Sequence, residues 1–369
     1  MKKSLIALAV LAASGAAMAQ SSVTLYGVAD AFVGSKDYNT VTAVSATGVV
    51  TTAKTRQTVI DTNGLNSSRW GLKGSEDLGG GLKALFVLES GLNIDTGAAT
   101  GGTTLFNRQA FVGLNSGFGT VALGRQYSAY DSIRGTFFSA QANSTSFDAT
   151  NSTSIGSGLG TALIAGTTAT ATPAAQAAAL NAVAGNRIGA WTGYQTRYDN
   201  SISFTSANYS GFQGSVVYGF GENKTATADA TRNVSVGLSY ANGPIGVAVS
   251  HADDEVLADF HVKNTGIGGY YDFGMAKAFL SFNQAKITGF EKQKEWAVGL
   301  RAPLGATTLV AQYAQSKGDD LGKNQSVGLE AQYSLSKRTT AYAAYNRTKI
   351  EVLNDSKNTL FGLGVRHTF

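Results

Sequence analysis

Period-two alternation of apolar and polar side chains is the feature that most constrains how this chain folds. In the last ten residues, one parity carries the apolar side chains Phe361, Leu363, Val365 and Phe369. The opposite parity carries the small or polar residues Gly362, Gly364, Arg366 and Thr368. Such alternation is typical of a β-strand with one apolar and one polar face. The same pattern recurs at 234–240, 278–283, 296–301 and 326–335, which predicts an all-β fold.

A soluble β-sandwich and a membrane β-barrel share this alternation, so the spacing of the strands has to separate them. Sixteen strand candidates lie near 21–34, 59–76, 80–94, 104–116, 118–126, 196–209, 211–222, 232–242, 243–253, 260–273, 274–288, 292–304, 305–317, 322–335, 337–350 and 358–369. Many run to about 11–15 residues, which is long enough for a tilted crossing of a bilayer.

Tight turns alternate strictly with longer polar loops along this series. The longer loops lie near 35–58, 95–103, 127–195, 223–231, 254–259, 289–291, 318–321 and 351–357. Short turns at one end and long loops at the other are typical of outer-membrane barrels. The sequence therefore predicts a 16-stranded antiparallel transmembrane β-barrel, with both chain ends on the short-turn side.

The two ends of the chain and its composition fit this fold. Lys2 and Lys3 precede a short apolar run, and Ala17, Met18 and Ala19 form a small-x-small site, so residues 1–19 are predicted to be a secretory signal peptide. Residues 20–369 would then form a single barrel domain. The chain has no Cys, so no disulfide can hold it together.

Aromatic residues cluster toward the predicted strand ends. Examples are Tyr26, Tyr240, Tyr313 and Phe369. Interfacial girdles and ordinary strand packing both explain such positions, and the alternation of turns and loops favours girdles.

The segment 127–195 interrupts the hairpin rhythm. Its middle, 142–184, is almost entirely Ala, Thr, Ser, Gly and Asn, a composition that cannot build a core and that favours an exposed insertion. Its first part, 127–138, is aromatic and charged. We expect this part to fold inward as a third loop that narrows an otherwise wide channel.

Strand parity identifies candidate channel-lining residues. Trp70 and Leu72 point to lipid, so Arg69 and Lys73 point to the lumen. By the same reasoning, Arg197 and Asp199 face inward. Glu89 also faces inward, although two apolar residues, Leu85 and Val87, share its parity.

Two further arginines do not follow parity. Arg108 and Arg125 share a side with apolar neighbours, but both lie near strand ends, where a bulge or the membrane boundary can relocate them. The loop segment adds the candidates Asp131 and Arg134, and Asp148 is its only other acid.

Each inward arginine on its own has a simple explanation as a solvated side chain paired with a nearby acid. As a group, Arg69, Arg108, Arg125 and Arg197 flank or face a segment that contains few acids. Rings of Arg and Lys favour anions in pores, so the sequence predicts a weak to moderate anion preference.

Several blocks of the sequence resemble the general porins of beta-proteobacteria and neisseriae. These blocks are SSVTLYG (21–27), SRWGLKGSEDLGGGLK (68–83), NRQAFVGL (107–114), GRQ (124–126) and GVRHTF (364–369). The resemblance spans the chain after residue 19. It implies a homotrimer of sixteen-stranded barrels, an inward third loop, and a terminal Phe369 that serves as an assembly signal. It also implies that Arg69, Arg108 and Arg197 line the constriction. The chain departs from the family in its Ala/Thr-rich enlargement at 142–184.

Enzymatic function finds no support in the sequence. His251, His261 and His367 are scattered, and no nucleophile motif, P-loop or metal-ligand cluster is present. We therefore expect no catalytic residue, cofactor, metal or nucleic-acid partner. An adhesin remains an alternative, since a long loop can bind other surfaces. The expected function is passive diffusion of small hydrophilic solutes and ions across the outer membrane, in contact with its lipid and lipopolysaccharide.

Overall fold

The computed structural model describes residues 22–44, 50–142, 145–151, 191, 194–226, 229–257, 259–289, 292–318, 322–351 and 356–369. The predicted signal peptide and most of the 142–184 insertion lie outside the described residues. The prediction that the insertion is exposed is wrong for its described part, 145–151, which is mostly buried. The helical elements of the described part are α2 (Ala129–Ile133) and one turn of π-helix, η1 (Arg134–Phe138).

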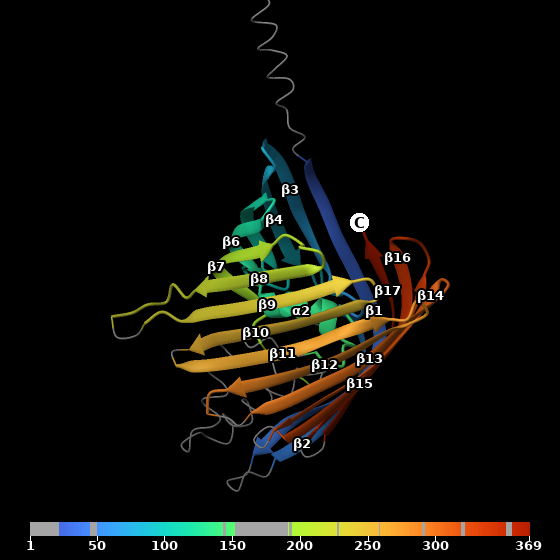
Figure 1. The fold of residues 1–369 in the computed structure, drawn as a ribbon. Helices are drawn as coiled ribbons and strands as arrows, with labels where there is room; N and C mark the ends of the chain where they lie inside the picture. The colour runs from blue at the N-terminus through green and yellow to red at the C-terminus, as the bar shows by residue number, and fades with distance from the viewer. Residues whose placement is uncertain are drawn as a thin grey trace, which may run out of the picture.

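Seventeen antiparallel strands form a single sheet (Figure 1). They are β1 (Ser22–Val44), β2 (Val50–Thr62), β3 (Arg69–Gly79), β4 (Leu82–Gly91), β5 (Gln109–Ser116), β6 (Gly119–Tyr127), β7 (Arg197–Ser206), β8 (Phe212–Phe220), β9 (Arg232–Asn242), β10 (Ile245–Leu257), β11 (Phe260–Asp272), β12 (Lys277–Ile287), β13 (Gln293–Leu304), β14 (Thr307–Gly318), β15 (Gly322–Ser334), β16 (Thr339–Ile350) and β17 (Ser356–Thr368).

The sheet closes because β1 pairs with β17, with Val28 opposite Thr368. On its other side, β1 pairs first with β3 and then with β2. β2 and β3 thus share one position in the wall, and the seventeen strands make the sixteen-stranded barrel that the sequence predicts. The predicted loop at 35–58 is wrong in extent, because β1 continues to Val44 and β2 begins at Val50.

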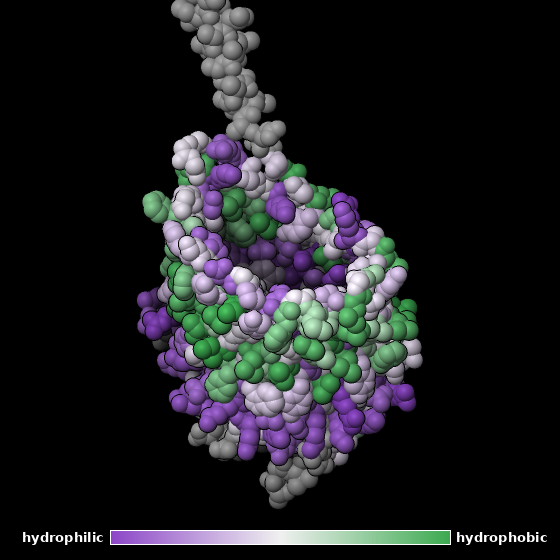
Figure 2. Space-filling model, turned by 45° about the vertical axis from the view of Figure 1, so that its right-hand side comes forward, coloured by the Kyte–Doolittle hydropathy of each residue, from purple (hydrophilic) through white to green (hydrophobic). Residues whose placement is uncertain are grey.

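The two faces of the wall follow the predicted alternation. On β13, Trp296, Val298 and Leu300 are exposed on the outer side, whereas Glu295 and Ala297 are buried on the inner side. Figure 2 shows the result as a hydrophobic band across the visible face of the barrel, with hydrophilic side chains at the rims and in the mouth. A closed barrel leaves no unpaired strand edge, so an apolar exterior of this kind is compatible with lipid.

A buried carboxylate holds the interruption between β2 and β3. The backbone N–H groups of Gly64, Leu65 and Asn66 donate to the Asp30 carboxylate at 3.1, 2.8 and 2.8 Å. The Tyr342 hydroxyl of β16 donates to the same carboxylate at 2.6 Å. Four donors around one charge compensate for its burial. This node fixes the segment that leads into Arg69.

We predict that the Asp30→Asn variant is less stable by about 1–3 kcal/mol, because an amide cannot accept all four of these hydrogen bonds. Equilibrium unfolding of the refolded protein in lipid vesicles measures this difference. The matched control is Asp95→Asn, at an exposed loop position. Equal stability of the Asp30→Asn variant and the unmodified protein would show that the node is dispensable.

Candidate functional site

The described part of the third loop lies against the inner face of the barrel. The Tyr130 backbone N–H donates to Ser235 Oγ at 2.8 Å, and Ser281 Oγ donates to the Phe138 carbonyl at 2.8 Å. The Gln141 side chain donates to Glu330 Oε1 at 2.8 Å. The three wall residues belong to the inward parity of β9, β12 and β15. In Figure 1, α2 accordingly lies behind β9 and β10.

Glycines on the inner wall make room for this loop. A Cβ atom at Gly237 would lie 2.3 Å from Ile133 Cδ1, and one at Gly266 would lie 2.5 Å from Phe138 Cε2. Gly268, Gly299, Gly328 and Gly362 are in similarly close contact with the loop. Because no side chain fits at these positions, the loop packs directly on the backbone of the wall.

Arg134 ties the loop to itself. Its guanidinium is fully buried, pairs with Asp148 at 3.1 Å, donates to Thr150, and lies over the rings of Trp191 and Tyr194. Burial lowers the pKa of this guanidinium, but Tyr194, Asp148 and Asp131 together raise it above its ordinary value. The expectation that Arg134 lines the aqueous channel is therefore wrong, because the side chain has no exposure to solvent.

We predict that the Arg134→Gln variant is destabilised by about 3–5 kcal/mol, because Asp148 is left as an uncompensated buried charge. Single-channel recordings should show a larger and more variable conductance as the loop loosens. The control is Arg232→Gln, at an exposed position. A conductance distribution indistinguishable from that of the control would refute the anchoring role.

Charged side chains from neighbouring strands meet at Glu89 on the inner wall. Arg108 Nε donates to Glu89 Oε1 at 2.7 Å, and Arg69 Nε lies 3.3 Å from Glu89 Oε2. The Tyr26 hydroxyl donates to Glu89 at 3.1 Å, and Lys73 Nζ lies 5.1 Å from the Tyr26 ring centroid. One carboxylate thus serves two guanidinium groups.

Tyr127 extends this group to β7. Arg108 and Arg197 both donate to the Tyr127 hydroxyl, at 2.5 and 2.9 Å. The Arg197 guanidinium also lies 4.4 Å from the centroid of the Tyr127 ring. Arg69, Lys73, Arg108 and Arg197 are hereafter the cationic cluster. Among the described residues, Glu89 is the one carboxylate that pairs with this cluster, and it contacts two of the four cations.

Parity places Arg69, Lys73, Glu89 and Arg197 on the inner face, and the structure brings them together with Arg108. Arg108 precedes the first residue of β5, so it is free of the strand's alternation. The sequence assigns Tyr26 to an interfacial girdle and Tyr127 to the inward loop segment, and it predicts neither as a partner of the arginines. The inward parity of Tyr26 on β1 is the signal that could have identified it.

Arg125 does not join the cationic cluster. Its guanidinium donates to the Asn107 carbonyl at 2.7 Å and pairs with Asp199. The register between β6 and β7 shifts between Gly124 and Gln126, where Asp199 and Asn200 lie opposite Arg125 alone. At this bulge the carboxylate of Asp199 pairs with Arg125, whereas Arg197 donates to Tyr127.

Asp131 is also removed from the aqueous channel. It is buried in α2 and accepts a hydrogen bond from the Tyr194 hydroxyl at 2.7 Å. Like Arg134, it belongs to the packing of the loop. The prediction that Asp131 lines the channel is therefore wrong, because its side chain is buried within the loop.

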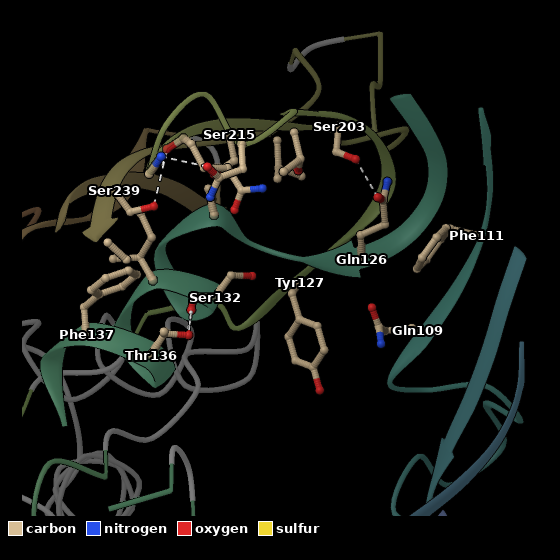
Figure 3. A pocket seen from close by; sticks show the side chains of 18 residues that line it. Gln109, Phe111, Gln126, Tyr127, Ser132, Thr136, Phe137, Ser203, Ser215 and Ser239 are labelled. Carbon is tan, nitrogen blue, oxygen red and sulfur yellow. Dashed lines mark hydrogen bonds between the residues drawn. The ribbon is translucent and has the colours of Figure 1, made fainter. Parts of the chain in front are cut away.

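A cavity of about 440 Å³ lies between α2 and the wall formed by β5–β9. Figure 3 shows hydroxyl and amide groups around it, including Gln109, Gln126, Ser203 and Ser215, together with the ring of Tyr127. None of its lining side chains carries a charge at neutral pH. The lumen beside the loop therefore accommodates water and polar solutes.

Neither a membrane-crossing helix nor a metal site is found in the described residues. No helix there is long and apolar enough to span a bilayer. No group of three or more His, Asp or Glu side chains in the same residues is arranged to hold an ion.

A closed antiparallel barrel with an apolar exterior, a polar lumen and a loop packed inside it defines an outer-membrane channel. Residues 5–352 match the Gram-negative porin family. The chain is 34% identical to an outer membrane porin protein of Bordetella pertussis over the full length of both. It is 36% identical to outer membrane porin protein 32 of Delftia acidovorans, over 93% of this chain and 88% of that protein.

Solved structures agree with this assignment. The anion-selective porin from Comamonas acidovorans is 26% identical, with a TM-score of 0.70 over 95% of this chain and 100% of the other. The chain therefore belongs to the Gram-negative porin family. Members of this family are channels rather than enzymes, and this chain is an outer-membrane porin for passive diffusion of small hydrophilic solutes.

Proposed function

We propose that the channel has a weak to moderate preference for anions, and that the cationic cluster sets it. The observation that carries the proposal is the imbalance of four cations around the single carboxylate of Glu89. Fixed positive charge on a channel wall raises the local concentration of anions. The solved relative from Comamonas acidovorans is an anion-selective porin, which supports the same direction.

The way the cluster is held supports a role in selectivity rather than mere charge pairing. Glu89 can neutralise only one of the two arginines that it contacts. The Tyr127 ring orients Arg197 through its face and hydroxyl without cancelling the charge. Salt ions in the water-filled lumen screen the positive charge that Glu89 does not neutralise, so the preference for anions stays modest.

The assembly and export of the protein are part of the same proposal. Residues 1–19 would direct export and be removed. The barrel would form a homotrimer in a membrane that contains lipopolysaccharide, with Phe369 as the assembly signal. Support for the last role comes from the backbone of Phe369, which exchanges hydrogen bonds of 3.0 and 3.1 Å with Gly27 of β1, so the terminal residue helps to close the barrel. No catalytic activity is proposed.

We predict that the double variant Arg69→Ser/Arg197→Ser loses most of the anion preference, because two of the four positive charges are removed. Reversal potentials in a salt gradient across a planar bilayer measure the permeability ratio. The matched control is Arg125→Ser, which removes an arginine whose charge is paired with Asp199. An unchanged ratio in the double variant, or an equal loss in the control, would disprove the assignment. Absence of stepwise conductance from the unmodified protein would disprove the channel function itself.

The Glu89→Gln variant should shift selectivity in the opposite direction. It removes the negative charge among the four cations, so the anion-to-cation permeability ratio should rise at low ionic strength, where screening is weak. Its stability should fall by about 1–3 kcal/mol, because Arg69 and Arg108 lose a charged acceptor. A ratio that falls in this variant would contradict the electrostatic account.

A further inference from the structure

Three lysines stand side by side on the outer face of the barrel. Lys294 of β13 is directly opposite Lys317 of β14, and Lys317 is directly opposite Lys323 of β15. All three side chains are exposed. They share the outward parity of Trp296, Leu309 and Leu329. We call Lys294, Lys317 and Lys323 the lysine row.

Direct opposition of like charges works against the fold. Paired residues on neighbouring antiparallel strands have Cβ atoms about 4.5–5.5 Å apart, and like charges at such positions are destabilising. Within the described part of the chain, no ion pair compensates the ammonium groups of the row. Glu351 accepts a hydrogen bond from Lys323, but from its backbone N–H. Three exposed ammonium groups in direct opposition form a surface that attracts anions.

Two aromatic residues fix the depth of the row in the membrane. Trp296 and Tyr313 are in contact on the outer face, with ring centroids 5.1 Å apart. Trp and Tyr on the lipid side of a barrel mark the boundary between hydrocarbon and headgroups. Lys294 lies two residues from Trp296 on the same face, which is about 7 Å further toward the loop end. This position is that of lipid phosphates.

The charge is confined to one rim of these strands. At the short-turn end, the outward positions of β13–β15 hold the uncharged residues Ala302, Leu304, Thr307, Ala331 and Tyr333. At the loop end, further like-charged pairs flank the row. Lys349 is opposite Lys357, and Lys263, which pairs with Asp253, is opposite Lys286. Figure 2 shows the matching hydrophilic border below the hydrophobic band. On the outer face of β13–β15, cationic side chains of the strands thus meet only the leaflet at the loop end.

We propose that the lysine row binds the phosphate groups of an anionic lipid headgroup in the outer leaflet, one that carries two phosphates. Two steps of strand spacing make the row about 10 Å long, which lets a bisphosphorylated headgroup bridge its three ammonium groups. The bound phosphates remove the repulsion within the row. The site rests on the outer-membrane placement of the barrel and is independent of the channel's selectivity.

The test uses the full-length protein, refolded in a nonionic detergent at low ionic strength. Titration with lipid A that carries two phosphates should give saturable binding, tighter than with lipid A that carries one. Lys317→Gln should weaken binding about fivefold, since each basic residue near an anionic headgroup contributes about that factor. Lys317→Arg should retain binding, because it keeps the charge. The matched control is Lys337→Gln, an exposed lysine in a turn at the opposite end.

Thermal unfolding gives a second readout, the difference in melting temperature between Lys317→Gln and the unmodified protein, which should depend on whether lipid is present. Without lipid, Lys317→Gln should melt at or above the temperature of the unmodified protein, because repulsion is relieved. With bisphosphorylated lipid A, the unmodified protein should gain the larger stabilisation.

Inorganic pyrophosphate alone tests whether free phosphate is the ligand. Equal affinity for pyrophosphate and lipid A would overturn the lipid assignment, and unchanged lipid binding by Lys317→Gln would overturn the site. Conductance of the same variants should be unaltered, so a failure of the channel function would be recorded separately.

Discussion

The pairing of β1 with β17 is the contact on which the rest of the structure depends. In hydrocarbon, an unpaired backbone N–H or C=O costs several kcal/mol, so a sheet can face lipid only when it has no edge. In a closed barrel, alternate residues of each strand face lipid and the lumen in turn. The hydrogen bonds of Phe369 with Gly27 and the node at Asp30 extend this closure along both sides of β1. Function follows from it, since the same closure that satisfies the backbone creates a polar interior.

The interior is shaped to receive the third loop. Wall glycines such as Gly237 and Gly266 leave space into which Ile133 and Phe138 of the loop pack. Polar wall residues such as Gln312 accept hydrogen bonds from the loop backbone, in this case from Ala140. The loop is thus seated by shape and hydrogen bonds, and Arg134 joins its parts internally. The cationic cluster lies on the wall beside this seat and has its own support in Glu89 and Tyr127. Changes in the loop and changes in the cluster should therefore affect pore size and ion preference separately.

Regular strand patterns made most of the fold readable from the sequence. The inward positions of Arg69, Lys73 and Glu89 follow from the period of two alone. Prediction failed where the backbone leaves that period. The bulge that separates Arg125 from the cluster contains Asn200 with a φ of 47°, a local conformation that no periodicity reveals. The sequence also could not tell a charged residue in the lumen from one inside the loop. Arg134 and Asp131 are polar residues in a polar segment, and only their partners Asp148 and Tyr194 show that they are buried.

The two cationic surfaces of the barrel use different residue types for physical reasons. Inside, the cluster is mostly arginine, whose planar group bonds Glu89 or Tyr127 and still presents charge to the lumen. A charge held in this way acts on passing ions without moving. Outside, the row is lysine throughout, a compact charge on a flexible stem. Such side chains can follow headgroups that move in the plane of the membrane. Rigidly held arginines suit ions that pass through the channel, whereas flexible lysines suit a lipid headgroup that stays bound while it moves in the membrane.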